Sequence, residues 1–147
     1  MIDLNKLLAE WENECQIGTH LDNATREVPH LHAKYLRLYT RAQVELKNAQ
    51  QTHKILLKNK WLWFQGKLSK EDIDKFEWSY DPFEGLKILK GDMDKFYESD
   101  VDIQASDKKV SYLKMCVETL KEIMDQLKWR SQHIRNIQQY LNYESGG

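Results

Sequence analysis

The chain has 147 residues, and only 6 of them are glycine and 2 are proline. Turn-rich sandwich and barrel folds need more turn residues than this, so the composition favours an all-α fold in a single domain over residues 1–147. The sequence lacks the pattern of a signal peptide and any apolar run of the roughly 18 residues that a membrane span needs, which predicts a cytoplasmic protein.

The formal net charge of −1 conceals an uneven distribution of charge along the chain. Residues 30–67 hold eight Lys and Arg side chains and a single acid, whereas residues 71–107 hold twelve acids and four lysines. Residues 1–29 carry a net charge of −4, and residues 108–147 carry +3. So strong a positive excess predicts that residues 30–67 bind either a polyanion or the acidic segment of their own chain.

The N-terminal part of the chain is predicted to hold two helices. The first covers residues 3–15, because apolar side chains follow helical spacing there, namely Leu4, Leu7, Leu8 and Trp11. Residues 18–29 are expected to form a connector that ends at Pro29. A long helix is expected from about residue 30 to residue 64, with Gly66 at its C-cap. At 1.5 Å per residue it would span roughly 50 Å, so part of it must face a partner or solvent.

The acidic segment, residues 67–107, is expected to contain short helices and loops. Ser69 followed by Asp72 resembles a capping box, which opens a helix that ends at the turn of residues 80–82. Apolar residues between 86 and 93 indicate another short element, whose type the pattern leaves open.

The clearest predicted element is a helix over residues 108–142. Its apolar residues repeat at alternating intervals of three and four, which is a heptad pattern, and a second row runs beside the first. A face this wide exceeds the seam of a two-stranded coiled coil and predicts a homo-oligomer larger than a dimer. The side chains predicted to form its interface are Val110, Leu113, Val117, Leu120, Met124, Leu127, Ile134, Ile137 and Leu141.

The basic helix and its C-terminal end have the composition of a surface that binds single-stranded DNA. Cations neutralise phosphates and aromatic rings stack on bases, and this segment offers both. Trp61 is ambiguous because a tryptophan at helical spacing more often belongs to a core, and we favour the core here. The competing interpretation is that the helix docks on the chain's own acidic segment. The candidate DNA-binding residues are Lys34, Arg37, Arg41, Lys47, Lys54, Lys58, Lys60, Lys67 and Trp61.

Catalytic and metal sites are poorly supported. Aspartates form three pairs of the kind that holds Mg²⁺ in some nucleases, namely Asp72 with Asp74, Asp92 with Asp94, and Asp100 with Asp102. No basic phosphate clamp accompanies these pairs in the local sequence. His30 and His32 have no further ligands near them. We therefore expect no enzyme activity, no catalytic residue, no metal and no cofactor. Two alternatives stay open, a helical adaptor with no DNA role and a metal-dependent nuclease.

Two stretches of the sequence carry a family pattern. In residues 33–66, the motif Leu57-Lys58-Asn59-Lys60-Trp61 precedes Phe64-Gln65-Gly66. In residues 128–146, basic residues, isoleucines and a glutamine come first, and an aromatic residue, a glutamate, a small residue and a glycine end the stretch. The first group is Arg130, Ile134, Arg135, Ile137 and Gln138, and the end is Tyr143-Glu144-Ser145-Gly146. Both stretches resemble the phage recombination mediator UvsY family. The acidic segment matches this family only loosely, and residues 1–29 barely match it.

The resemblance implies a recombination mediator that binds single-stranded DNA as a hexameric or heptameric ring. It also implies two protein partners, a RecA-like recombinase that the mediator helps to load and the single-strand-binding protein that the recombinase replaces. For a phage protein the location would be the host cytoplasm. The family's DNA-contacting basic residues carry over to Lys58 and Lys60. Position 60 often holds arginine in the family, and lysine keeps the charge but lacks the planar fork of donors.

Overall fold

The computed structural model describes residues 1–146, and all regular secondary structure within them is helical. This confirms the all-α prediction. The elements are α1 (Leu4–Glu14), α2 (Leu21–Phe64), α3 (Lys70–Phe76), the 3₁₀ helix η1 (Lys90–Asp92), α4 (Met93–Glu98), α5 (Val101–Lys128) and α6 (Arg130–Glu144).

The chain packs as two compact units, and both long helices contribute to each unit. The terminal unit consists of residues 1–46 together with the chain from residue 113 onward. The central unit consists of residues 47–112. Each unit therefore contains one part of α2 and one part of α5.

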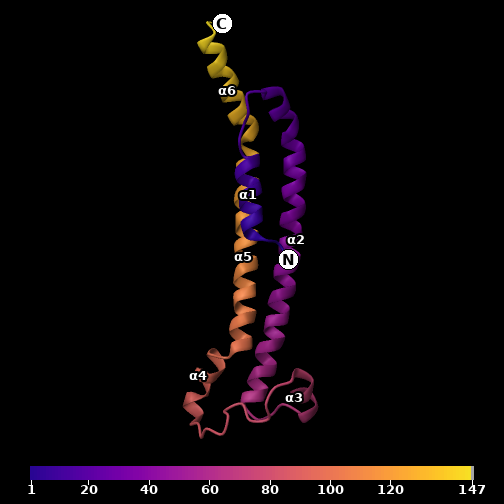
Figure 1. Ribbon diagram of the computed structural model, residues 1–147, viewed down its shortest axis with the longest axis vertical. Helices are drawn as coiled ribbons and strands as arrows, with labels where there is room; N and C mark the ends of the chain where they lie inside the picture. The colour runs from indigo at the N-terminus through magenta and orange to yellow at the C-terminus, as the bar shows by residue number, and fades with distance from the viewer. Residues whose placement is uncertain (147) are drawn as a thin grey trace. The chain divides into compact units, whose positions relative to one another are not determined.

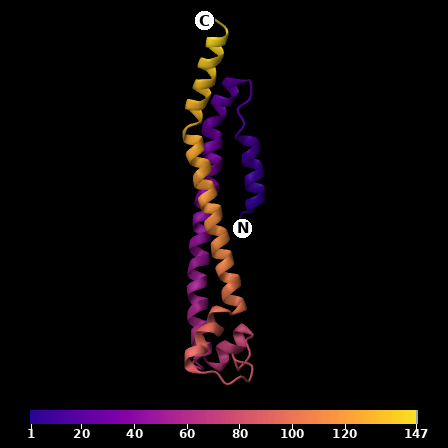
Figure 2. The same ribbon diagram turned by 90° about the vertical axis from the view of Figure 1, so that its left-hand side faces the viewer.

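In the terminal unit, α1 and the adjoining parts of α2 and α5 run alongside one another (Figures 1 and 2). Asp3 caps α1, because its carboxylate accepts a hydrogen bond from the Lys6 amide at 3.2 Å. The Trp11 ring meets the Tyr35 ring edge-on, with 5.5 Å between centroids. The buried apolar side chains of this unit include Leu7, Leu31, Tyr35, Ala42, Leu113, Cys116, Leu120, Ile123, Leu127 and Ile134.

The predicted connector over residues 18–29 is wrong over residues 21–29, because α2 begins at Leu21 and contains Pro29. The apolar spacing of the long helix continues backwards through Val28, Ala24 and Leu21, and Ala24 is buried. Proline removes one amide donor from a helix but does not stop neighbouring apolar residues from packing. Burial of this extended face therefore outweighs the local preference of the proline.

The predicted helix over residues 108–142 is wrong at its start and in its continuity. It begins earlier, at Val101, because the Asp100 carboxylate accepts a hydrogen bond from the Ile103 amide at 3.0 Å and caps the first turn. It is interrupted at Trp129, although no Gly or Pro lies there. At this point the buried Arg130 guanidinium donates to the Cys15 carbonyl at 3.0 Å and to the Gln16 carbonyl at 3.1 Å, just after α1.

In the central unit, the last turns of α2 and the first turns of α5 run side by side, and α3 and α4 lie at their end (Figures 1 and 2). The His53 ring and the Ser106 hydroxyl join the two long helices at 2.9 Å. A buried cluster of Trp63, Phe64 and Ile73 forms the core of this end. Partly buried side chains that pack on the cluster are Leu68, Trp78, Phe83, Met93, Phe96 and Tyr97.

Of the three helix ends predicted in the central unit, the structure confirms two. Gly66 has a positive φ of 71°, and the Lys67 amide donates to the Leu62 carbonyl at 2.8 Å, which confirms the glycine C-cap of α2. Ser69 caps α3 as predicted, accepting from the Asp72 amide. The predicted end of α3 at residues 80–82 is wrong, because Glu77 adopts the left-handed conformation and ends the helix at Phe76.

Candidate nucleic-acid interface

One face of α2 in the central unit carries a row of exposed cations and one exposed aromatic ring. Lys47, Lys54, Lys58 and Trp61 follow one another at intervals of seven, four and three residues, which places them on one side of an α-helix. All four are exposed, and Trp61 retains 47% of its accessible surface. Beyond the helix end, the Lys67 ammonium lies 5.6 Å from the centroid of the Trp61 ring.

We refer to Lys47, Lys54, Lys58 and Lys67 as the lysine stripe. None of these four lysines forms an ion pair with any other residue in the described range 1–146. Their charges are therefore compensated by solvent and counterions. Release of such counterions is the main source of affinity when a protein binds the phosphates of a nucleic acid.

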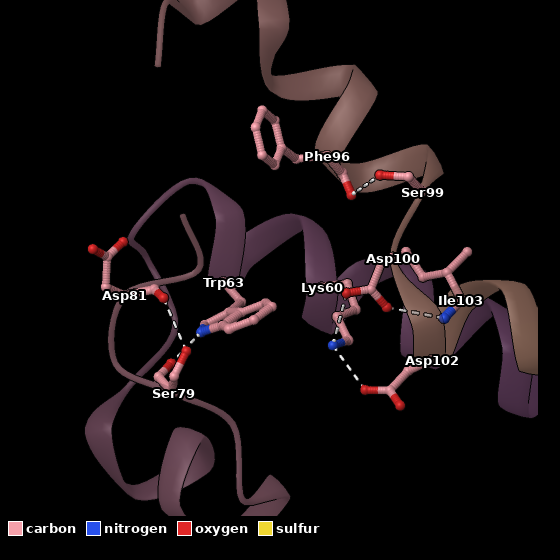
Figure 3. Close-up of polar contacts among 9 residues, drawn as sticks. All are labelled: Lys60, Trp63, Ser79, Asp81, Phe96, Ser99, Asp100, Asp102 and Ile103. Atoms are coloured by element: carbon pink, nitrogen blue, oxygen red, sulfur yellow. Dashed lines mark hydrogen bonds and ion pairs between the residues drawn. The ribbon is translucent and has the colours of Figure 1, made fainter. Parts of the chain in front are cut away.

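The structure places Trp61 at the surface, whereas the sequence favoured a core position. Its neighbours Trp63 and Phe64 supply the core contacts instead, with 5.0 Å between their ring centroids. The Trp63 indole N–H donates to the Ser79 carbonyl at 2.8 Å, so this ring is both packed and hydrogen-bonded (Figure 3). A half-exposed indole beside lysines has the geometry that base stacking requires.

Lys60 lies apart from the lysine stripe. It is 2% exposed, and its ammonium forms ion pairs with Asp100 at 3.0 Å and Asp102 at 2.9 Å (Figure 3). The sequence did not identify either aspartate as a partner of this lysine. The opposite charges of the basic and acidic segments were the only available indication. Within residues 1–146, Lys60 is the one lysine of residues 30–67 that forms ion pairs with the acidic segment.

Two of the four Lys and Arg side chains of α2 in the terminal unit are paired with acids of the chain, namely Lys34 and Arg41, whereas Arg26 and Arg37 form no ion pair within residues 1–146. The Lys34 ammonium forms ion pairs with Glu14 and, at 3.4 Å, with Glu10. Desolvation acts to lower the pKa of Lys34, but the hydrogen bond to Glu14 and the charges of both acids outweigh it and leave this pKa raised. Arg41 pairs with Glu45 one turn along the helix at 3.2 Å. Arg37 is exposed and has no ion pair within residues 1–146.

The side chains predicted to form an oligomer interface are placed in two different environments. Val110 is buried in the central unit, and Leu113, Leu120, Leu127 and Ile134 are buried in the terminal unit. These five take part in the packing of the chain itself. The others are half-buried or exposed, namely Val117, Met124, Ile137 and Leu141.

Within residues 1–146, no group of three or more His, Cys, Asp or Glu side chains is arranged to hold a metal ion. Among the same residues, no helix is both long and apolar enough to cross a membrane.

A family model described as "Recombination, repair and ssDNA binding protein UvsY" matches residues 10–147. The chain belongs to the UvsY family. It shares the fold of crystal structures of the bacteriophage T4 recombination mediator protein UvsY. Lattice type II matches with a TM-score of 0.78 at 20% identity, covering 99% of both chains. Lattice type IV matches with a TM-score of 0.78 at 19% identity, covering 97% of this chain and 99% of the other. Among curated protein sequences, none matches.

Membership of the UvsY family confirms the resemblance and extends it across the acidic segment, which the sequence motifs matched only loosely. It supports a role in recombination, repair and single-stranded DNA binding. The lysine stripe and Trp61 offer the two kinds of group that contact single-stranded DNA, cations for phosphates and an aromatic ring for bases.

Proposed function

We propose that the protein is a recombination mediator that binds single-stranded DNA as a homo-oligomer larger than a dimer. In this proposal it helps to load a RecA-like recombinase onto DNA covered by single-strand-binding protein. The observation that carries the proposal is the unpaired lysine stripe beside the exposed Trp61 ring, in a chain of the UvsY family.

The stripe supports binding that is indifferent to base sequence. Lysine ammonium groups contact phosphates, which are the same in every nucleotide, and every base offers a face on which an indole can stack. Lys54 and Lys58 are one helical turn apart, and Trp61 is almost one turn further, so cations and ring follow one line. An extended strand along this line would place phosphates on the lysines and one base on the indole.

Apolar side chains left exposed in the terminal unit support assembly into an oligomer. Leu141 is 48% exposed and Trp129 is 61% exposed, both on or beside α6. Together with the half-buried Val117, Met124 and Ile137, they offer an apolar surface to neighbouring copies. A ring repeats one lysine stripe per protomer, so contacts that are weak singly become strong together. A hexamer or heptamer would serve this purpose.

Binding and assembly are tested first. We expect light scattering to give a mass above that of two chains, and we expect an oligothymidylate and a mixed-sequence oligonucleotide of equal length to bind with equal affinity. Affinity should fall steeply with salt, with a slope of about −0.7 per contacted phosphate. A mass of one or two chains would overturn the oligomer, and absence of salt-dependent binding would favour the helical adaptor without a DNA role.

Loading is tested separately, in a reaction that contains a RecA-like recombinase and DNA precoated with single-strand-binding protein. The DNA-dependent ATPase activity of the recombinase reports how fast its filament forms. We expect the protein to shorten the lag before ATP hydrolysis on coated DNA and to have little effect on bare DNA. An unchanged lag on coated DNA, with DNA binding intact, would reduce the function to strand binding alone.

A further inference from the structure

Lys58 and Lys60 are the two basic residues of the family motif, and they point in opposite directions. Successive residues of an α-helix are about 100° apart, so positions 58 and 60 differ by about 200°. Lys58 is exposed in the lysine stripe, whereas Lys60 faces the interior of the central unit. One strand lying along one side of α2 cannot contact both ammonium groups.

The surroundings of Lys60 are those of a structural contact. Its side chain is 3% exposed, and the paired Asp100 side chain is 9% exposed. The Asp100 carboxylate has a second task, because it also caps α5 through the Ile103 amide (Figure 3). The second partner, Asp102, lies in the first turn of α5 and is 53% exposed. Lys60 therefore ties the last turns of α2 to the start of α5.

Aromatic contacts add a third element to this connection. The Lys60 ammonium lies 4.0 Å from the centroid of the Trp78 ring and 4.5 Å from that of Trp63. A cation at such a distance is attracted by the ring face, and the attraction is stronger in a desolvated site. Trp78 follows α3 in the chain, so one ammonium group joins α2, α5 and the segment after α3.

From this geometry, we infer that Lys60 is a positioning residue for strand binding and makes no phosphate contact. It fixes the inner face of the last α2 turns, and the same turns present Lys58 and Trp61 on the outer face. Two carboxylates already surround one ammonium, so the local charge is negative and would repel a phosphate. Turning Lys60 outward would also leave the nearly buried Asp100 carboxylate without its cation, which is strongly unfavourable.

The inference rests on the proposed single-stranded DNA binding and is tested by salt titrations of oligonucleotide binding. Lys58→Met and Lys60→Met make the same change on opposite faces of one helix. We expect Lys58→Met to reduce the salt slope by about 0.7 for each lost phosphate contact and to leave thermal stability unchanged. Lys60→Met should lower thermal stability and weaken binding severalfold with an unchanged slope, and Lys60→Arg should restore most of the affinity.

A second variant covers the case in which Lys60→Met does not fold. Asp100→Asn with Asp102→Asn removes both charges that hold Lys60, and asparagine at position 100 still caps α5. If Lys60 is a positioning residue, this variant binds no more tightly than the wild type and its salt slope does not increase. A steeper slope here would overturn the inference, as would a slope reduced by Lys60→Met as much as by Lys58→Met. Unchanged affinity of a folded Lys60→Met would overturn it too.

Failure of the inference is distinguishable from failure of the proposed function. If the wild-type protein shows no salt-dependent binding, the proposed function fails. If the wild type binds and Lys58→Met behaves as expected, only the result for the Lys60 and aspartate variants decides the role of Lys60.

Discussion

The two parts of α2 contain similar numbers of basic residues but differ in how those residues are compensated. In the terminal unit, Lys34 and Arg41 form ion pairs with acids of the same chain. In the part of α2 that belongs to the central unit, Lys47, Lys54 and Lys58 form none within residues 1–146, and of these α2 cations Lys60 alone is paired. We therefore expect unpaired cations, and not the net charge along a helix, to set its affinity for DNA, because only uncompensated cations release counterions on binding.

The largest expected effect comes from removing the uncompensated cations of the central unit. Each phosphate contact raises the binding constant about fivefold at 0.1 M salt. Lys47→Gln, Lys54→Gln and Lys58→Gln together should therefore weaken oligonucleotide binding roughly 100-fold per protomer. The matched control replaces Lys34, Arg37 and Arg41 by glutamine in the terminal unit. Of these, only Arg37 is unpaired, so a loss of about fivefold is expected.

Fluorescence anisotropy with a labelled oligonucleotide measures both triple variants under identical salt. Circular dichroism and light scattering verify that fold and mass are retained. Equal losses in the two variants would show that total charge governs binding, and the distinction between paired and unpaired cations would be lost.

A smaller effect on DNA affinity is expected from replacing Trp61. This substitution removes a stacking ring but no charge, so it distinguishes the two contributions to binding. Trp61→Ala should weaken binding by about 1 kcal/mol, the lower end of the range of about 1–3 kcal/mol for a stacked base, because the ring is already half covered. Trp61→Phe retains a stacking face and should recover part of this loss. The salt slope should be the same in all three proteins. A slope that falls with Trp61→Ala would mean that the ring acts by orienting Lys67 and not by stacking.

Much of the fold could be predicted from the sequence because it depends on local rules. Apolar spacing located α1 and the cores of both long helices, and Gly66 and Ser69 marked helix ends through backbone geometry that only a few residue types favour. The errors occurred where distant contacts override local preference. Pro29 stays inside α2, and α5 is interrupted next to Arg130, whose partners lie more than a hundred positions earlier in the chain.

The candidate site could be predicted less completely than the fold. Composition and charge placed Lys47, Lys54 and Lys58 among the candidate DNA-binding residues without singling out the helix face that they share. They did not separate Lys58 from Lys60, since charge alone treats both as surface residues. The burial of Lys60 depends on Asp100, Asp102 and the tryptophans around them, which come together only when the central unit packs.

The smallest effect on DNA binding is expected from replacing Lys34, a cation that is paired with acids of the chain. Its side chain is 32% exposed, and Glu14 and Glu10 already compensate its charge. Lys34→Met should change oligonucleotide affinity by less than about twofold, because no counterion is released from a paired cation. It should instead lower the free energy of unfolding by about 0.5 kcal/mol, a value reduced by solvent screening. Arg37→Met, at the unpaired cation three positions further along the same helix, should show the reverse pattern.

The pH dependence of this stability difference provides an independent check. Because the pKa of Lys34 is raised in the folded protein, the contribution of its ion pairs is fully present below the unfolded-state pKa of about 10.4 and is lost as pH rises through the folded-state pKa. Urea denaturation should therefore separate wild type from Lys34→Met at pH 7, and the difference should shrink above about pH 10.5. Titration of groups that lie away from Lys34 is common to both proteins and cancels. A difference that stays constant through this range would mean that Lys34 stabilises the terminal unit through its aliphatic stem, and its charge would then be available to DNA after all.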